Sequence, residues 1–169
     1  MATSEKNLSV YDKSTLPNAE DMKFGLVVSE WNPDITENLF QGAFDAFIDV
    51  GVIKENIVRW NAPGSFELPY ACKKMQESFD MLDAIIAIGN VIQGETKHFD
   101  FVCQGLTQGI MELNLKSDIP IIFCVLTDNT KAQSLARSGG AHGNKGTEAA
   151  IAAIKMAKLR KDAKFYKAD

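Results

Sequence analysis

The sequence predicts an α/β protein: a three-layer sandwich of flavodoxin-like type, with a four-stranded parallel core sheet and helices on both faces. Short apolar runs recur at intervals of roughly 30 residues, and a helical pattern follows each run, as in consecutive βαβ units. The runs are almost continuously apolar, which indicates strands that are covered on both faces. These two observations decide the class.

The strands and helices are predicted from apolar runs and from helical spacing. The predicted strands are residues 24–28, 56–60, 84–88 and 119–126, and the predicted helices are residues 33–50, 68–79, 96–113, 130–138 and 144–159. Asn32 and Pro33 supply an N-cap and a first-turn proline, and Gly51 ends the first helix. Thr130 and Gln133 have the form of a capping box for the fourth.

The first 22 residues are mostly polar and are predicted to form an N-terminal arm, followed by a single domain over residues 23–169. A weak alternation at residues 8–11 makes the arm a candidate for an added edge strand. The total of 169 residues suits one domain with a sizeable core.

Composition and charge exclude several classes of protein. The net charge of −4 argues against a nucleic-acid partner, because binding phosphates needs a basic surface. No apolar run approaches the ~20 residues that span a bilayer, so we expect no membrane partner. Cys72, Cys103 and Cys124 lie far apart in apolar contexts, which indicates reduced thiols in a cytoplasmic protein, neither metal ligands nor nucleophiles.

Residues 89–98 carry the strongest functional signal. They follow the third predicted strand and contain His98, one of only two histidines, so we expect a glycine-flanked loop with His98 one turn into the next helix. A helix N-terminus binds anions, and imidazole titrates near neutral pH. The pattern indicates a phosphorylated substrate that undergoes proton transfers, although a lone histidine is more often structural or simply exposed.

Unusual residues follow two further strands. Ligands of open parallel sheets bind beyond the carboxyl ends of the strands, so Trp31, residues 63–67 and residues 94–98 should meet at one crevice. Trp31 would stack on a planar heterocycle, with a hydrophobic staple as the alternative. Glu67 could accept hydrogen bonds from a ring N–H or sugar hydroxyls, or could simply complement its helix dipole.

A second cationic region lies near the C-terminus. Arg137 and Lys145 bracket a segment with glycines at positions 139, 140, 143 and 146, which suggests flexible backbone around one anion held by both cations. Each charge-assisted hydrogen bond would contribute about 1.5–3 kcal/mol. A helix-terminal cation with a glycine cap explains Arg137 equally well. Phe123, inside the fourth strand, is a core residue by periodicity.

These motifs, in this order, resemble the lumazine synthase family from about residue 20 to the C-terminus. The matching segments are residues 31–32, 63–69, 89–98, 121–123, 137 and 143–146. The resemblance implies a transferase of riboflavin biosynthesis that condenses 5-amino-6-ribitylaminouracil with 3,4-dihydroxy-2-butanone 4-phosphate. The products are 6,7-dimethyl-8-ribityllumazine, phosphate and water.

The resemblance also implies site residues. Those matched to substrate binding are Trp31, Asn32, Gly64, Ser65, Phe66, Glu67, Asn90, Val91, Ile92, Gly94, Glu95, Thr96, Phe123 and Arg137, and those matched to catalysis are His98, Arg137 and Lys145. Trp31 would stack on the pyrimidine, and residues 65–67 would bind the ribityl chain. Glu95 and Thr96 would hold the phosphate with Arg137, and His98 would shuttle protons. Phe123 would come from a neighbouring subunit.

The same resemblance implies small-molecule substrates, no cofactor or metal, and a homopentamer. The unchanged length of the segment around residues 139–141 favours assembly of the pentamers into a 60-subunit shell, with riboflavin synthase as a candidate partner. Two alternatives stay open: an archaeal-type riboflavin synthase, and a flavin-binding or shell-forming relative without catalysis.

Overall fold

The computed structural model of the protein describes residues 7–165. Four parallel strands form the central sheet in the order β2-β1-β3-β4. Their bounds are β1 Phe24–Ser29, β2 Ile57–Ala62, β3 Ala84–Ile92 and β4 Ile121–Asp128. The predicted parallel core sheet is confirmed.

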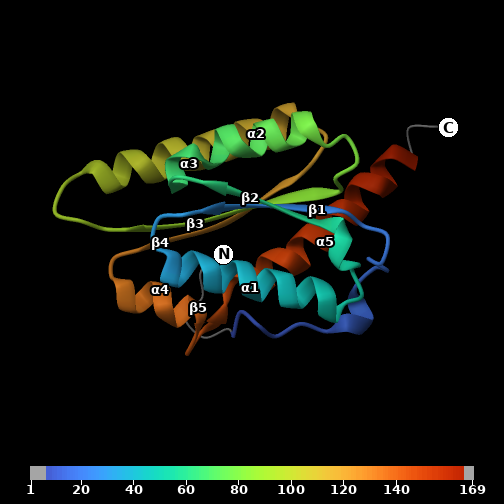
Figure 1. The fold of residues 1–169 in the computed structure, drawn as a ribbon, viewed down its shortest axis with the longest axis horizontal. Coiled ribbons are helices and arrows are strands. Elements are labelled where there is room, and N and C mark those ends of the chain that lie inside the picture. Colours follow the sequence, from blue (N-terminus) through green and yellow to red (C-terminus); the bar gives the residue numbers. More distant parts are fainter. Residues whose placement is uncertain (1–6, 166–169) are drawn as a thin grey trace.

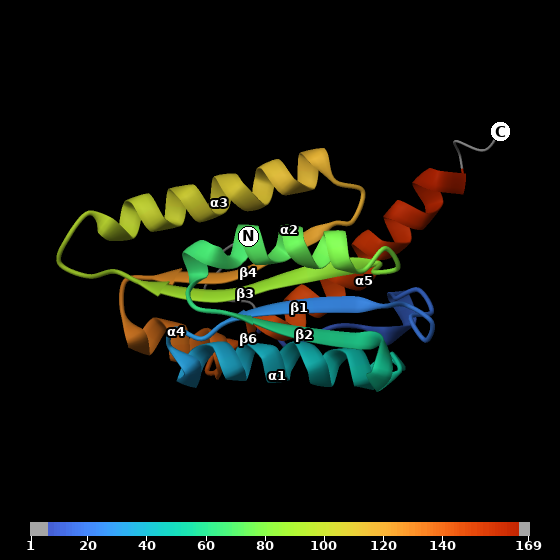
Figure 2. The same cartoon turned by 45° about the horizontal axis from the view of Figure 1, so that its top comes forward.

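Helices cover both faces of this sheet. The α-helices are α1 Pro33–Asp49, α2 Leu68–Ser78, α3 His98–Lys116, α4 Lys131–Arg137 and α5 Lys145–Phe165. Helices α2 and α3 lie on one face, and α1, α4 and α5 lie on the other (Figures 1 and 2). Short 3-10 helices and a small hairpin complete the fold: η1 Lys13–Thr15, η2 Lys54–Asn56, η3 Ser65–Glu67, β5 Ser138–Gly140 and β6 Gly143–Asn144.

The sheet separates two apolar cores. Leu26 and Val28 of β1 pack with Phe47 of α1 on one side, while Val27 packs with Met75 of α2 on the other. Alternate residues of the strand therefore face opposite cores, and all six residues of β1 are buried. Burying each large apolar side chain contributes about 1.5–3 kcal/mol.

Strand β3 is longer than predicted, and this changes the site. Its ladder with β4 continues from Gly89↔Val125 to Ile92↔Asp128, so residues 89–92 are strand, and the prediction of a loop there was wrong. A Cβ at position 89 would lie 2.6 Å from the Ser65 hydroxyl oxygen, so this glycine allows a close approach.

The starts of α1 and α4 were predicted correctly, but the side-chain cap of α1 and the start of α3 were not. Thr130 and Gln133 form the capping box of α4, and Asn32 precedes Pro33 at the start of α1 but makes no side-chain cap. Helix α3 begins at His98, so that residue is not one turn inside the helix. Helix α5 continues to Phe165, beyond the predicted end at residue 159.

The described part of the N-terminal arm, residues 7–22, packs along the molecule and contains no strand. The backbone N–H of Leu8 donates to the carbonyl of His142 over 2.9 Å. The Tyr11 hydroxyl and the Lys13 ammonium both bind Asp49. Over these residues, the candidate edge strand is not formed within the chain, and residues 1–6 lie outside the described part. None of the described helices is both long and apolar enough to cross a membrane.

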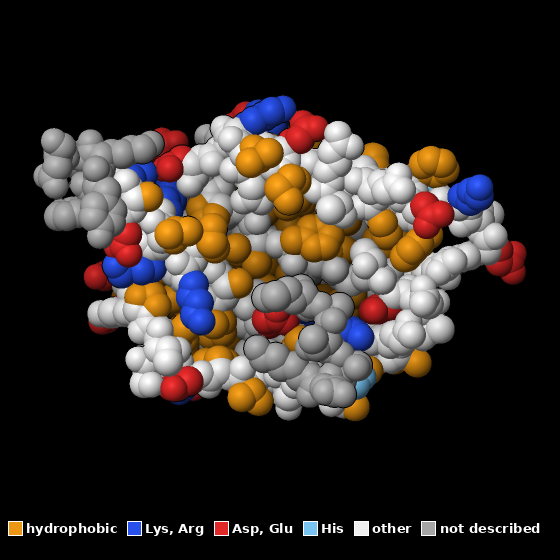
Figure 3. Space-filling view, turned by 180° about the vertical axis from the view of Figure 1, so that it is seen from behind, with side chains coloured by type: hydrophobic (Ala, Val, Ile, Leu, Met, Phe, Trp, Pro, Cys, Tyr) orange, Lys and Arg blue, Asp and Glu red, His pale blue; other side chains and the backbone are white. Residues whose placement is uncertain are grey.

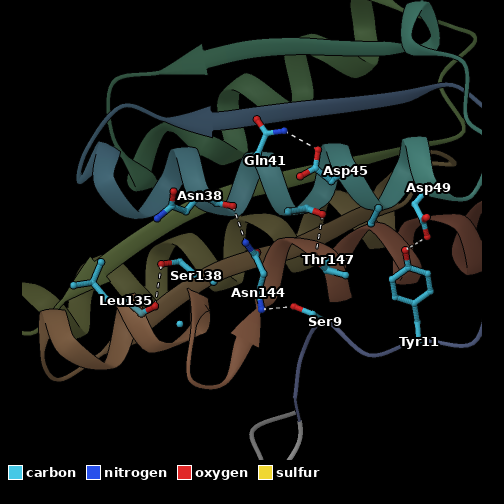
Figure 4. A pocket seen from close by; sticks show the side chains of 14 residues that line it. Ser9, Tyr11, Asn38, Gln41, Asp45, Asp49, Leu135, Ser138, Asn144 and Thr147 are labelled. Atoms are coloured by element: carbon cyan, nitrogen blue, oxygen red, sulfur yellow. Dashed lines mark hydrogen bonds between the residues drawn. The ribbon is translucent and has the colours of Figure 1, made fainter.

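A polar junction holds α1, the β5–β6 hairpin and the arm together. It borders a surface hollow of about 820 Å³ (Figure 4). The Asn144 amide donates to the Asn38 carbonyl and accepts from the Gly146 N–H, both at 2.8 Å. A Cβ at position 146 would overlap the Leu39 carbonyl oxygen. These contacts give Gly146 and Asn144 a packing role, so flexible backbone is not what this glycine provides.

We expect Asn144→Ala to lower the free energy of unfolding by about 2–3 kcal/mol, because one buried and one partly buried backbone group lose their partners. Asn38→Ala is the matched control, since Asn38 uses only its backbone carbonyl in this bond and its side chain is exposed. Thermal or urea unfolding at fixed protein concentration measures both. Equal midpoints for the two variants would contradict the role of Asn144.

Candidate active site

A first hollow of about 490 Å³ lies at the carboxyl ends of β1, β2 and β3 and the start of α3. Its lining residues are Trp31, Asn32, Gly64, Ser65, Phe66, Glu67, Asn90, Val91, Ile92, Gly94, Thr96, His98, Phe99 and Val102. Twelve of these were predicted as site residues from the sequence, which left out only Phe99 and Val102. Glu95 is exposed in the same loop but does not line the hollow.

Asn90 on β3 organises this hollow, and it is only 1% exposed. Its side-chain oxygen accepts from the Asn32 amide at 2.8 Å, and its amide donates to the Ser134 hydroxyl at 2.9 Å and the Leu126 carbonyl at 3.3 Å. Its backbone N–H and carbonyl both bond to the Ser65 hydroxyl at 3.1 Å. The side chain of Asn90 thus ties the segment after β1 to β4 and α4, and its backbone ties the segment after β2 to the end of β3.

Two aromatic faces stand open around this hollow. Trp31 is 67% exposed and Phe66 is 56% exposed. Asn32 beside Trp31 has φ of +57°, the single positive φ of a non-glycine residue in the described chain. Its bond to Asn90 holds this left-handed conformation, which directs the chain from Trp31 into α1. The arrangement can bind a planar heterocycle by stacking.

His98 is the first residue of α3 and is exposed. Its backbone N–H donates to the Thr96 hydroxyl at 3.4 Å, which closes the turn before the helix. Among the described residues, none forms a hydrogen bond with the imidazole. Both ring nitrogens can therefore exchange protons with a bound molecule.

A second hollow of about 570 Å³ lies beside β4, α4 and the first turn of α5. Its lining residues are Leu8, Phe123, Val125, Leu126, Thr127, Asp128, Asn129, Gln133, Arg137 and Lys145. The Arg137 Nε lies 3.8 Å from Asp128 Oδ1, and the Lys145 ammonium lies 2.9 Å from Glu148. Two partly buried cations make this hollow suitable for an anion.

Phe123 belongs to the second hollow. Periodicity predicted a core position, but the ring is half-buried and only packs against the core between the sheet and helices α2 and α3. Strand β4 is an edge of the sheet, so one flank of its backbone pairs with no further strand within residues 7–165.

Within one chain, His98 and Arg137 line different hollows. The expectation that both contact one phosphate therefore requires a second copy of the chain to bring the two hollows together. The sequence predicted most residues of the first hollow and three of the second, Phe123, Arg137 and Lys145, but not that the two groups separate in the monomer.

Asp128 and Ser134 were missed by the sequence reasoning. Asp128 lies two residues after the apolar run of the fourth strand, close to the place relative to a strand end that made Trp31 and residues 63–67 candidates. That signal could have identified it. Ser134 is fully buried inside a short helix, and nothing in the sequence around it distinguishes it.

The cysteines offer no nucleophile. All three are free thiols, and Cys72 and Cys124 are buried. Burial raises the pKa of the Cys72 thiol, and burial is also the main cause that raises the pKa of Cys124 to about 12. Burial, and then the nearby Asp100 carboxylate, raise the pKa of the Cys103 thiol. The reactive thiolate is therefore disfavoured at each position near neutral pH.

A parallel α/β sandwich of this strand order is a flavodoxin-like fold, and its aromatic hollow at the strand ends and separate cationic hollow suit a heterocycle and an anion. A family model described as 6,7-dimethyl-8-ribityllumazine synthase matches residues 21–161. The chain belongs to this family.

Relatives that carry this name span nearly the whole chain. The one from Christiangramia forsetii is 77% identical over 167 residues, which cover 99% of each chain. The one from Flavobacterium johnsoniae is 66% identical over 163 residues, 96% of this chain and 85% of its own. The one from Porphyromonas gingivalis is 50% identical over 161 residues, 95% of this chain and 99% of its own.

We expect Asn90→Ala to lower the free energy of unfolding by about 3 kcal/mol, because its side chain loses two buried hydrogen bonds and one partly buried one. Asn61→Ala is the matched control: Asn61 is an exposed strand residue with one side-chain bond, to Arg59. Urea unfolding checks both. A loss of stability at Asn90 no larger than at Asn61 would show that the network holds nothing together.

Proposed function

We propose that this chain condenses 5-amino-6-ribitylaminouracil with 3,4-dihydroxy-2-butanone 4-phosphate to 6,7-dimethyl-8-ribityllumazine, phosphate and water. The observation that carries the proposal is the first hollow, where twelve residues matched to the family's site line one surface. The names of the relatives support the same reaction. An archaeal-type riboflavin synthase and a relative without catalysis are not favoured, since no name among these relatives points to either.

Each half of the site has a task in this proposal. Trp31 stacks on the pyrimidine, Asn32 and residues 90–92 line its pocket, and residues 64–67 bind the ribityl chain. Gly94 shapes the following loop, in which the Glu95 and Thr96 amides bind the phosphate together with Arg137. His98 transfers protons, Lys145 assists from the second hollow, and Phe123 closes the pocket over the heterocycle.

The chemistry suits these side chains. An aryl amine adds to a ketone, a phosphate leaves, and a ring closes, so every step moves protons and none is a redox step. A positioned general acid–base contributes about 10²–10⁴ in rate. Holding two substrates in register contributes more, up to ~7–11 kcal/mol of the barrier. The imidazole of His98, free of partners among the described residues, can serve the proton transfers.

The active site in this proposal forms between two copies of the chain. The first hollow of one copy, with His98, faces the second hollow of its neighbour, with Arg137, Lys145 and Phe123. An apolar hollow of about 590 Å³ beside edge strand β4, lined by residues such as Met111 and Leu159, supports burial of this side. Apolar side chains gather on the face opposite that of Figure 1 (Figure 3).

The assembly that we propose is a homopentamer, with pentamers joined into a 60-subunit shell and riboflavin synthase as a candidate partner inside it. We also propose a cytoplasmic location and a division into an arm, residues 1–22, and one domain, residues 23–169. The arm's contacts to α1 and to the β5–β6 hairpin support its packing on that domain.

Mixing the two substrates with the purified protein tests the function directly. The appearance of lumazine absorbance together with release of one phosphate per product supports the proposal. Conversion of lumazine to riboflavin without use of the butanone phosphate would indicate the riboflavin synthase alternative. Flavin binding without turnover of either kind would indicate the non-catalytic one.

We expect His98→Ala to lower kcat by about 10²–10⁴ and to leave a slow but measurable enzyme, because substrate positioning is retained. His142→Ala is the control, since this second histidine lies outside the first hollow. Steady-state lumazine formation measures both variants. Undetectable turnover of His98→Ala with intact substrate binding would contradict this division of labour.

A site shared between copies predicts complementation. His98→Ala and Arg137→Ala chains, unfolded and reassembled together in equal amounts, should regain up to about a quarter of wild-type sites, since His98 and Arg137 then come from different chains. The parents reassembled alone, and His98→Ala mixed with the double variant, are controls without any intact site. Absence of recovery in well-formed mixed oligomers would exclude a site built from two chains.

A further inference from the structure

A continuous hydrogen-bonded chain connects the two hollows inside one copy of the protein. The Asn32 amide donates to Asn90 at 2.8 Å, the Asn90 amide donates to Ser134 at 2.9 Å, and the Ser134 hydroxyl donates to Asp128 Oδ2 at 2.8 Å. The other carboxylate oxygen, Asp128 Oδ1, lies 3.8 Å from the Arg137 Nε.

All three hydrogen bonds of this series run in the same direction, with each donor on the side of the first hollow and each acceptor on the side of the second. The series ends on the Asp128 carboxylate, whose oxygens can only accept while it is ionised. Asn90 and Ser134 are 1% and 0% exposed, so water does not compete for their bonds. Aligned hydrogen bonds in such surroundings strengthen one another, so the carboxylate is held firmly in place.

The Asp128 carboxylate lies in the hollow whose two cations, Arg137 and Lys145, suit an anion. Considered only as a charge, Asp128 repels a phosphate that approaches Arg137 and Lys145. Its side chain is 12% exposed and that of Arg137 is 27% exposed, so this repulsion is only partly screened. Asp128 therefore needs a compensating role, and its position beside Nε indicates one.

The geometry leaves the two terminal guanidinium nitrogens of Arg137 open to a ligand. Asp128 approaches Nε, and no described residue accepts a hydrogen bond from the guanidinium. The two terminal nitrogens can then meet a phosphate as a planar fork. Arg137 stands one turn after Ser134 on α4, so the bond from Ser134 to Asp128 also fixes the helix that carries it.

We propose that Asp128 and Ser134 are positioning residues that aim the Arg137 guanidinium at the phosphate of the substrate. This proposal rests on the phosphate role given to Arg137 above. Asp128 orients the guanidinium through Nε, and Ser134 anchors Asp128 to Asn90. The gain from orienting the cation exceeds the repulsion between the carboxylate and the phosphate.

The direction in which Asp128→Asn changes the KM for the butanone phosphate distinguishes a positioning role from a simple effect of charge. Asp128→Asn removes the negative charge, so charge alone predicts tighter phosphate binding and a lower KM for the butanone phosphate. Positioning predicts the opposite: a KM about tenfold higher, with kcat at saturation and the KM for the pyrimidine within about twofold of wild type. Ser134→Ala should raise the same KM, because it releases Asp128.

The effects of Asp128→Asn and Ser134→Ala on this KM should disappear when the Arg137 guanidinium is removed. In an Arg137→Ala background, Asp128→Asn and Ser134→Ala should change the KM for the butanone phosphate by less than about twofold, and the Asp128→Asn/Ser134→Ala double variant should match its stronger parent. Ser138→Ala is the matched control, because it removes another buried serine hydroxyl at the position next to Arg137. The Ser138 hydroxyl donates to the Leu135 carbonyl at 3.5 Å and does not contact Asp128. This variant should keep the wild-type KM.

A readout without turnover keeps this proposal separate from the proposed function. Inorganic phosphate should raise the melting temperature of the wild-type protein, and Asp128→Asn should need about ten times more phosphate for the same rise. If the condensation assay fails but this shift is seen, positioning stands and the assigned reaction falls. Tighter phosphate binding by Asp128→Asn, or full effects in the Arg137→Ala background, would overturn the positioning role.

Discussion

The hydrogen bonds of the buried residue Asn90 are the interactions on which the site depends. Asn90 lies near the end of strand β3, where neighbouring segments converge: its side chain bonds to Asn32 and Ser134, and its backbone bonds to Ser65. A buried polar group is tolerated only when its bonds are made, so the surrounding backbone must adopt this one arrangement. Trp31, Ser65 and the start of α4 are located by that requirement.

The strand order of the sheet then determines which side chains line the same hollow. Strands β1, β2 and β3 direct their carboxyl ends to the aromatic hollow, while edge strand β4 carries the cationic one with α4 and α5. A single chain holds two unlike halves at a fixed separation, joined through Asn90, Ser134 and Asp128. Two copies that bring unlike halves together would make a complete site, and each copy would serve two such sites.

Local patterns predicted much of this. The strand cores and the capping box of α4 follow from apolar runs and residue types alone. The end of β3 did not, because Gly89 and Asn90 are typical of loops, and only the ladder to β4 and the close approach of Ser65 make them strand. Asn32 was read as a capping side chain, but Asn90 engages its amide instead.

The sequence by itself determined the class of fold, the family and most residues of the first hollow, since these depend on periodicity and on motifs that are local. Of the second hollow it identified Phe123, Arg137 and Lys145. Only the tertiary structure decided that His98 and Arg137 line separate hollows within one chain, and that Asp128 lies beside Arg137. The physical reason is strand order: which strand becomes an edge is set by the packing of distant helices on the sheet, and no short segment carries that information.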